Sequence, residues 1–319
     1  MNPLHTPICD LFGIEYPIFL AGMGGVSTAP LVAAVSNAGG LGVIGAATMD
    51  PAELRRQIHE TRDRTDKPFA VDLLAPDPNR IRPQVEVMFD EDVKVFVAGL
   101  AVPADFIVEM HARGIKVVVM CGRVRHAQKS EQAGADVVAA QGTEAGGHTG
   151  EVGTMALVPQ VVDAVRIPVL AAGGLADGRG LVASLALGAQ GAVFGTRFIA
   201  SLESQAAQGY REAIVRAHED DTMRTRCYTG KPARMVRNAW TDAWELANGP
   251  GALGMPLQNI LTSEANARIR RSNRTDLQFA PVGQIVGRMN EVRSVRDVIY
   301  GLVEEYIDTV ERLEQGVQI

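Results

Sequence analysis

Short runs of apolar residues alternate along this chain with longer segments in which apolar positions recur at helical spacing. Strands of a parallel sheet are covered on both faces, so they read as continuous apolar runs. Eight such runs occur, at residues 17–23, 41–47, 69–75, 93–100, 116–122, 136–142, 168–174 and 191–198. Eight strands with helices between them predict an α/β fold of the (β/α)8 TIM barrel type, whose usual size is about 250 residues. A doubly wound open sheet is the structural alternative.

The segments between the runs carry helix start and stop signals. Asp50 can cap a helix that begins at Pro51. Gly114, Gly134 and Gly188 follow helical stretches, where a C-terminal glycine is expected. These signals support a regular succession of strands and helices.

The pattern changes after the eighth run. Residues 201–287 are richer in charged and polar side chains and lack clear apolar strands, and a long amphipathic helix then follows at 294–315. We therefore expect a barrel formed by residues 1–200 and 288–319. Residues 201–287 would form an inserted, mostly helical lid subdomain.

Composition and charge exclude several classes of protein. The chain has 319 residues and a net charge of −6, which gives no reason to expect a nucleic acid or an acidic membrane as partner. Three widely spaced cysteines form neither a disulfide framework nor a metal-binding pair. Residues 16–49 carry no charge, but glycines and polar residues interrupt them, so buried strands and a helix explain them better than a membrane span. With no secretory signal apparent at the N-terminus, we expect a soluble, cytoplasmic protein.

Glycines gather where the predicted strands end, which in a barrel is the functional face. They are Gly22, Gly24, Gly25, Gly142, Gly146, Gly147, Gly173, Gly174 and Gly195. The loops after the last two barrel strands commonly bind phosphate through backbone amides. The stretches 171–180 and 194–198 fit this description, with Thr196 as a further donor; the alternative is that the glycines only make tight turns. A GxGxxG dinucleotide fingerprint is absent in the proper context.

The stretch QGTEAGGHTG (141–150) places His148 after the sixth strand, on the same predicted face. A histidine can exchange a proton near neutral pH or bind an anionic ligand. The alternative is an ordinary surface or core histidine. Glu144 and His148 are four residues apart, but the glycines between strand and histidine exclude a regular helix, so a metal pair is not predicted.

Four stretches together resemble a known family. They are AGMGGVSTAPLVAAVSNAGGLGVIGA (21–46), QGTEAGGHTG (141–150), AAGGLADGRGLVASLALGAQGAVFGTRF (171–198) and VGQIVGR (282–288). In order and wording they resemble the FMN-dependent nitronate monooxygenase (2-nitropropane dioxygenase-like) superfamily. That superfamily also includes enoyl-acyl-carrier-protein reductase II and NADH:quinone reductases.

The resemblance implies FMN across the barrel mouth, with His148 as the catalytic residue beside the substrate. Gly22, Met23 and Gly24 would lie along the isoalloxazine ring. The full set of cofactor-binding residues implied in this way is Gly22, Met23, Gly24, Asp72, Gln141, Gly173, Gly174, Gly195, Thr196 and Gln284. Of these, Gly173, Gly174, Gly195 and Thr196 would hold the phosphate.

Two positions depart from the family pattern. Where the family usually has an asparagine that touches the flavin, the third strand carries Asp72. A carboxylate there would oppose the negative charge of a reduced flavin unless it were protonated or turned away. At the end of the fifth strand, Met120 stands where some members have a polar residue, and we expect it to pack against its neighbours.

The leading functional hypothesis is oxidation of alkyl nitronates by dioxygen to a carbonyl compound and nitrite. The first alternative is an NAD(P)H-dependent FMN reductase of a quinone or of an enoyl-CoA or enoyl-acyl-carrier-protein thioester. In it the basic stretch 224–234 and Arg237 could bind a phosphate, or could simply be a solvated face. The second alternative is a flavin-binding subunit without turnover of its own. Both enzymatic hypotheses imply small-molecule substrates, and a homodimer is possible.

Overall fold

The computed structural model describes residues 4–75, 78–272 and 274–316. Its central element is a parallel eight-stranded sheet in the order β1-β9-β8-β6-β5-β4-β3-β2. The strands are β1 (Ile18–Leu20), β2 (Gly42–Gly45), β3 (Phe69–Leu74), β4 (Val95–Gly99), β5 (Lys116–Cys121), β6 (Val137–Gln141), β8 (Val169–Ala172) and β9 (Gly191–Phe194). An isolated bridge between Phe19 and Leu41 joins β1 to β2 and brings the two sheet edges together. The predicted barrel is confirmed, and each of the eight apolar runs contains one of its strands.

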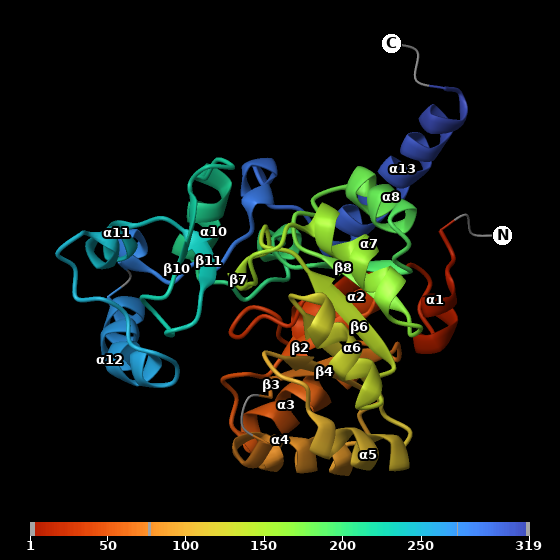
Figure 1. Ribbon diagram of the computed structural model, residues 1–319, viewed down its shortest axis with the longest axis horizontal. Helices are drawn as coiled ribbons and strands as arrows, with labels where there is room; N and C mark the ends of the chain where they lie inside the picture. Colours follow the sequence, from red (N-terminus) through yellow and green to blue (C-terminus); the bar gives the residue numbers. More distant parts are fainter. Residues whose placement is uncertain (1–3, 76–77, 273, 317–319) are drawn as a thin grey trace.

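Helices cover the outside of this sheet (Figure 1). They are α1 (Pro7–Phe12), α2 (Ala29–Asn37), α3 (Pro51–Arg62), α4 (Pro78–Asp90), α5 (Ala104–Ala112), α6 (Val124–Gln132), α7 (Thr154–Ala164), α8 (Gly178–Ala186), α9 (Thr196–Ile199) and α13 (Val295–Glu314). The run predicted as the eighth strand is divided, because β9 ends at Phe194 and α9 begins at Thr196. The last helix, α13, packs against α8 and α2 and completes the helical layer.

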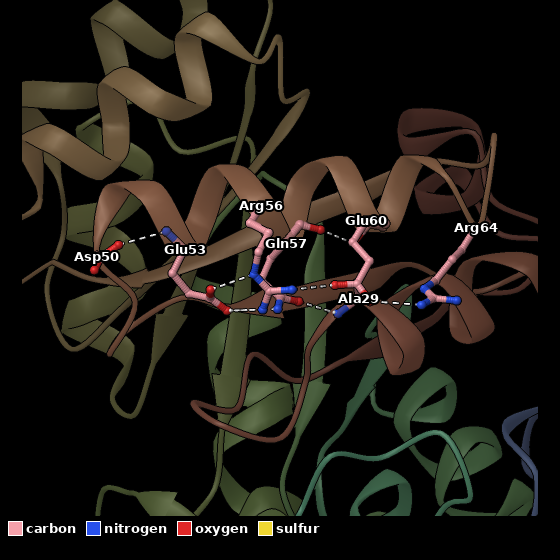
Figure 2. A network of polar contacts seen from close by, with 8 residues as sticks. Ala29, Asp50, Glu53, Arg56, Gln57, Glu60 and Arg64 are labelled. Atoms are coloured by element: carbon pink, nitrogen blue, oxygen red, sulfur yellow. Dashed lines mark hydrogen bonds and ion pairs between the residues drawn. The ribbon is translucent and has the colours of Figure 1, made fainter.

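The contact between α2 and α3 shows how the layer is fixed (Figure 2). Asp50 caps α3 as expected, by accepting a hydrogen bond from the Glu53 amide (2.8 Å). The first amide of α2, that of Ala29, is satisfied by Oε1 of the buried Gln57 (2.8 Å). Gln57 in turn donates to Glu53 (3.0 Å). Since the loop before α2 belongs to the barrel mouth, this cross-helix bond helps to position that loop.

The inserted segment lies beside the barrel, at the left of Figure 1. It contains α10 (Gln208–Arg216), β10 (Thr222–Thr225), β11 (Ala233–Val236), α11 (Ala239–Glu245), α12 (Leu257–Arg271), η1 (Thr275–Leu277) and the start of η2 (Gln284–Arg288). The sequence predicted its helices but not β10 and β11. These two strands form an antiparallel sheet with the two-residue strand β7 (Gly147–His148). The insertion is thereby joined to the loop after β6 through His148.

Candidate active site

The glycine-rich loop after β6 packs directly against other parts of the chain. A Cβ at Gly142 would collide with the hydroxyl of Thr154, and a Cβ at Gly146 would lie 2.6 Å from the carbonyl carbon of Val282. Gly147 has a φ of +69°, in the left-handed region that favours glycine. Glycine is therefore required at 142 and 146 by the close approach of other parts of the protein, and at 147 by the backbone conformation.

Glu144 holds the start of α7. Its two carboxylate oxygens accept hydrogen bonds from the Thr154 amide (3.0 and 2.9 Å), and Oε2 also accepts from the Thr154 hydroxyl (2.8 Å). Its backbone carbonyl accepts from the amide of Gln284 (2.9 Å). Gln284 is thus fixed beside the loop by its backbone, while its side chain is exposed. The carboxylate of Glu144 has a structural role at α7.

His148 is held from both sides. As part of β7 it pairs with Ala233 of β11, and its Nε2 lies 2.9 Å from the hydroxyl of Thr229. Its carbonyl accepts a hydrogen bond from the side chain of Gln141 (3.2 Å), at the end of β6. Burial, with a smaller contribution from the positive charge of Lys231, lowers the pKa of His148 to about 4. The imidazole is therefore neutral at pH 7.

The loops after β8 and β9 form an unsatisfied set of donors. Gly173 and Gly174 have φ values of +92° and +72°. Among the residues that the structure describes, no acceptor is found for the amides of Gly173, Gly174, Gly195 or Thr196. The Thr196 hydroxyl accepts from the amide of Gly283 (2.9 Å) and keeps its own proton available. Backbone donors without acceptors at a barrel mouth suit an anion such as phosphate.

The helix after β8 does not supply further donors. Asp177 caps α8 by accepting from the amides of Arg179 and Gly180. The amide of Gly178 donates to Glu305 of α13 (2.9 Å). A bound anion would therefore rest on the loop amides and on α9 rather than on the first turn of α8.

The loop after β1 also lies at the barrel mouth, next to the loop after β9. The Met23 amide donates to the Ser27 hydroxyl (2.7 Å), which fixes a tight turn, and Gly24 is exposed. A Cβ at Gly195 would lie 3.7 Å from the sulfur of Met23, so the loops after β1 and β9 are neighbours. Gly22 leaves space for the carboxyl group of Asp72, which a Cβ at that position would meet.

The predicted residues thus gather at one end of the barrel. A Cβ at Gly173 would lie 3.0 Å from that of Ala145, in the loop that carries His148, and one at Gly174 would lie 3.3 Å from the Cβ of Glu144. Met120, on β5, packs against the core as expected. The donor set fits the phosphate end of a nucleotide-like cofactor, with His148 on the adjoining loop.

The two residues that act most directly on the imidazole are Thr229 and Lys231. Sequence reasoning placed Lys231 in a possible phosphate-binding stretch but connected neither residue with His148. Both lie in the basic stretch between β10 and β11, and they reach His148 because β11 pairs with β7. The stretch itself could be recognised from its charge. The pairing of β7 with β11 joins segments about eighty residues apart in the sequence, and the local sequence pattern does not predict it.

Within the described residues, no helix combines the length and apolar character needed to cross a membrane. The parallel barrel, its donor-lined mouth and the adjacent histidine together define an enzyme of the α/β-barrel class.

Comparison with known proteins specifies the class further. The model of a family described as nitronate monooxygenase matches residues 5–84 and 79–305. A probable nitronate monooxygenase of Staphylococcus saprophyticus is 38% identical, over 74% of this chain and 79% of its own. The (3aS,4S,5R,7aS)-5-hydroxy-7a-methyl-1-oxo-octahydro-1H-indene-4-carboxyl-CoA dehydrogenase of Rhodococcus jostii is 34% identical, over 98% of this chain and 99% of its own. The solved structure of FabK from Thermotoga maritima is 39% identical, covers 98% of this chain and 99% of its own, and superposes with a TM-score of 0.89.

This chain belongs to the nitronate monooxygenase family. It is an oxidoreductase, and the family to which it belongs is flavin-dependent.

Proposed function

We propose that the protein is an FMN-dependent nitronate monooxygenase that oxidises alkyl nitronates with dioxygen to a carbonyl compound and nitrite. The single observation that carries this proposal is the charge state of the candidate site. A neutral imidazole lies within the electrostatic influence of the Lys231 ammonium. Such a site attracts an anion and does not require the histidine to be a strong base, and a nitronate is already deprotonated.

FMN would be held chiefly by the unsatisfied loop donors. The amides of Gly173, Gly174, Gly195 and Thr196 would bind its single phosphate, and Gly22, Met23 and Gly24 would lie along the ring. Gln141, bonded to the His148 carbonyl, and Gln284, whose amide is bonded to Glu144, would border the same space. When bound, the flavin supplies the redox chemistry, since it can take electrons from the substrate and pass them to dioxygen.

The protein's own residues would bind and orient the substrate. His148 would donate a hydrogen bond to a nitronate oxygen, with Thr229 fixing the orientation of the ring. Lys231 would favour the anion electrostatically, and the sheet formed by β7 and β11 would keep the imidazole from moving away. We further propose that residues 201–287 act as a lid over the mouth, since this segment supplies both Thr229 and Lys231.

The proposal is tested by nitrite release from propyl-2-nitronate in air by flavin-loaded protein. We expect wild-type turnover, and in His148→Asn a loss of about 10²–10³-fold with flavin retained. Lys231→Gln should raise KM for the nitronate more than it lowers kcat, because its role is long-range attraction. Wild-type protein that holds FMN but releases no nitrite would refute the proposal.

A second candidate function, an NAD(P)H-dependent reductase, is favoured by a cationic cluster beside the site. Burial, followed by the positive charges of Arg125, Arg123, Lys129 and Lys231, lowers the pKa of His126, and no acidic residue occupies the first turn of α6. A cavity of about 440 Å³ lies here, lined by Arg123, Val124, Arg125, Glu151, Val152, Leu157 and Gln160. The phosphates of a nucleotide or of a CoA thioester would suit these charges, and the Rhodococcus relative is named for a CoA substrate.

Three arginines in or next to the basic stretch are already engaged, as is Arg123, which pairs with Glu151 (3.4 Å). Arg234 donates to the Thr143 carbonyl (3.0 Å), Arg224 pairs with Glu151 (3.3 Å) and Arg237 pairs with Asp242 (2.6 Å). The reductase is therefore tested with the double variant Arg125→Ala/Lys129→Ala, and Lys94→Ala, an exposed lysine elsewhere on the barrel, serves as control. A reductase that uses this cluster should show KM for NADPH or a CoA thioester raised about tenfold or more, or about 1.4 kcal/mol, in the double variant alone. An unchanged KM would dismiss the cluster as a phosphate site.

A further inference from the structure

Asp72 is a buried acid at the mouth of the barrel. It lies on β3, paired in register with Gly45 of β2 and Val97 of β4, and only 7% of it is exposed. Its carboxyl group reaches Gly22, beyond the end of β1, although β2 lies between β1 and β3. The side chain therefore crosses the inner face of the barrel toward the proposed flavin ring.

Among the residues that the structure describes, none forms a hydrogen bond or ion pair with this carboxyl group. Its Oδ1 is buried without a hydrogen bond, and a Cβ at Gly99 would be 3.8 Å from it. The elements around it are the ends of β1, β2 and β4, and among the described residues no charged or titratable group of theirs acts on the acid. Desolvation alone raises the pKa of Asp72 to about 8.

An unpaired carboxylate in such a place would be costly, whereas a carboxylic acid carries a proton that it can donate. Nothing among the described residues accepts that proton. The flavin ring offers carbonyl oxygens and ring nitrogens as acceptors, and it becomes more electron-rich when reduced. A neutral donor next to it favours the reduced ring, and a carboxylate opposes it.

We propose that Asp72 is kept as a neutral carboxylic acid that donates a hydrogen bond to the bound flavin and thereby sets its reduction potential. The inference rests on the proposed flavin site. It concerns Asp72, which stands where the resembled family usually has an asparagine. It makes Asp72 a tuning residue whose effect depends on pH. Below its pKa the acid acts as an asparagine would. Above it, reduction of the flavin must be accompanied by uptake of a proton on Asp72.

The test compares the midpoint potential of the flavin in holoprotein from pH 6 to 9.5, in wild type, Asp72→Asn and Asp72→Ala. We expect wild type and Asp72→Asn to have nearly the same potential at pH 6.5. Above about pH 8 the wild-type potential should fall more steeply. Asp72→Ala, which has no donor, should lie below both at pH 6.5. Asp92→Asn is the matched control, since Asp92 is exposed on the α4–β4 turn and should leave the curve unchanged.

Two results would overturn the proposal. One is that the potentials of wild type and Asp72→Asn run parallel over the whole pH range. The other is that the wild-type potential is already lower than that of Asp72→Asn at pH 6.5. A second measurement does not depend on flavin or on activity. The infrared difference between wild type and Asp72→Asn at pH 7 should contain the carbonyl band of a protonated carboxyl group, which disappears near pH 9. A carboxylate band at pH 7 would refute protonation of Asp72. Failure to bind FMN would refute the proposed function, a distinct result.

Discussion

The replacement Asp72→Asn exchanges a buried acid for a neutral amide of nearly the same shape. The pKa of Asp72 is raised from 3.8 to about 8 by desolvation. Below pH 3.8 the carboxyl group is protonated in both the folded and the unfolded protein, so its ionisation does not affect stability. Between pH 3.8 and 8 the unfolded chain releases the proton and the folded chain keeps it, so wild-type stability falls as pH rises.

The size of the effect follows from the same values. Each pH unit in this window removes about 1.4 kcal/mol of wild-type stability, which amounts to about 4 kcal/mol at pH 7. Above pH 8 both states are ionised and the loss stops growing. Asparagine does not ionise, so the advantage of Asp72→Asn over wild type should increase along this slope from pH 4 to 8 and then level off.

Equilibrium urea unfolding of flavin-free wild type and Asp72→Asn at pH 5, 6, 7 and 8 measures this slope. Any difference in packing between the amide and the acid shifts the free energy of unfolding equally at every pH, so it does not change the slope. The free energy of unfolding of Asp92→Asn, a change at an exposed position, should run parallel to that of wild type. If Asp72→Asn also runs parallel to wild type, Asp72 is ionised in the folded protein, and both the burial argument and the proposed proton fail.

The remaining predictions concern the histidine, a helix contact and a glycine. Because the pKa of His148 is about 4, kcat/KM for a nitronate should show no inflection from His148 between pH 6 and 8, and an inflection near 6.5 that disappears in His148→Asn would contradict this. Gln57→Ala leaves the buried Ala29 amide without its acceptor, so urea unfolding should show a loss of about 1–3 kcal/mol, and an unchanged midpoint would argue against the bond. Gly146→Ala forces a Cβ against the backbone at 282–283 and should cost about 1–3 kcal/mol, whereas Gly254→Ala, which has open space, should be close to neutral. Equal stability of the two glycine variants would refute the packing argument.

The barrel could be predicted because each of its strands is buried on both faces. A strand of this kind is mostly apolar, as in the runs that became β5 and β6, and the sequence shows this without any knowledge of its partners. The strands β10 and β11 are different. Their residues, TMRT and ARMV, carry charges and no apolar alternation, and they are strands only because they pair with each other and with β7.

The site was predictable to a similar degree. The glycines and His148 could be placed at the barrel mouth because the ends of parallel strands meet on one face. That the first turn of α8 contributes no open donor could not be predicted, because Asp177 and Glu305 satisfy its amides, and the bond from the Gly283 amide to the Thr196 hydroxyl was equally unforeseen. The structural role of Glu144 at α7 was equally hidden, since its partner Thr154 lies in another element. The roles of individual site residues toward the cofactor stay predictions.

The most direct test of the proposed function is the visible spectrum of the purified protein, loaded with FMN and kept free of oxygen. We predict that an alkyl nitronate will bleach the oxidised flavin bands, while NADH and NADPH leave them unchanged. Rapid bleaching by either nucleotide, with no response to the nitronate, would contradict the account and identify a reductase.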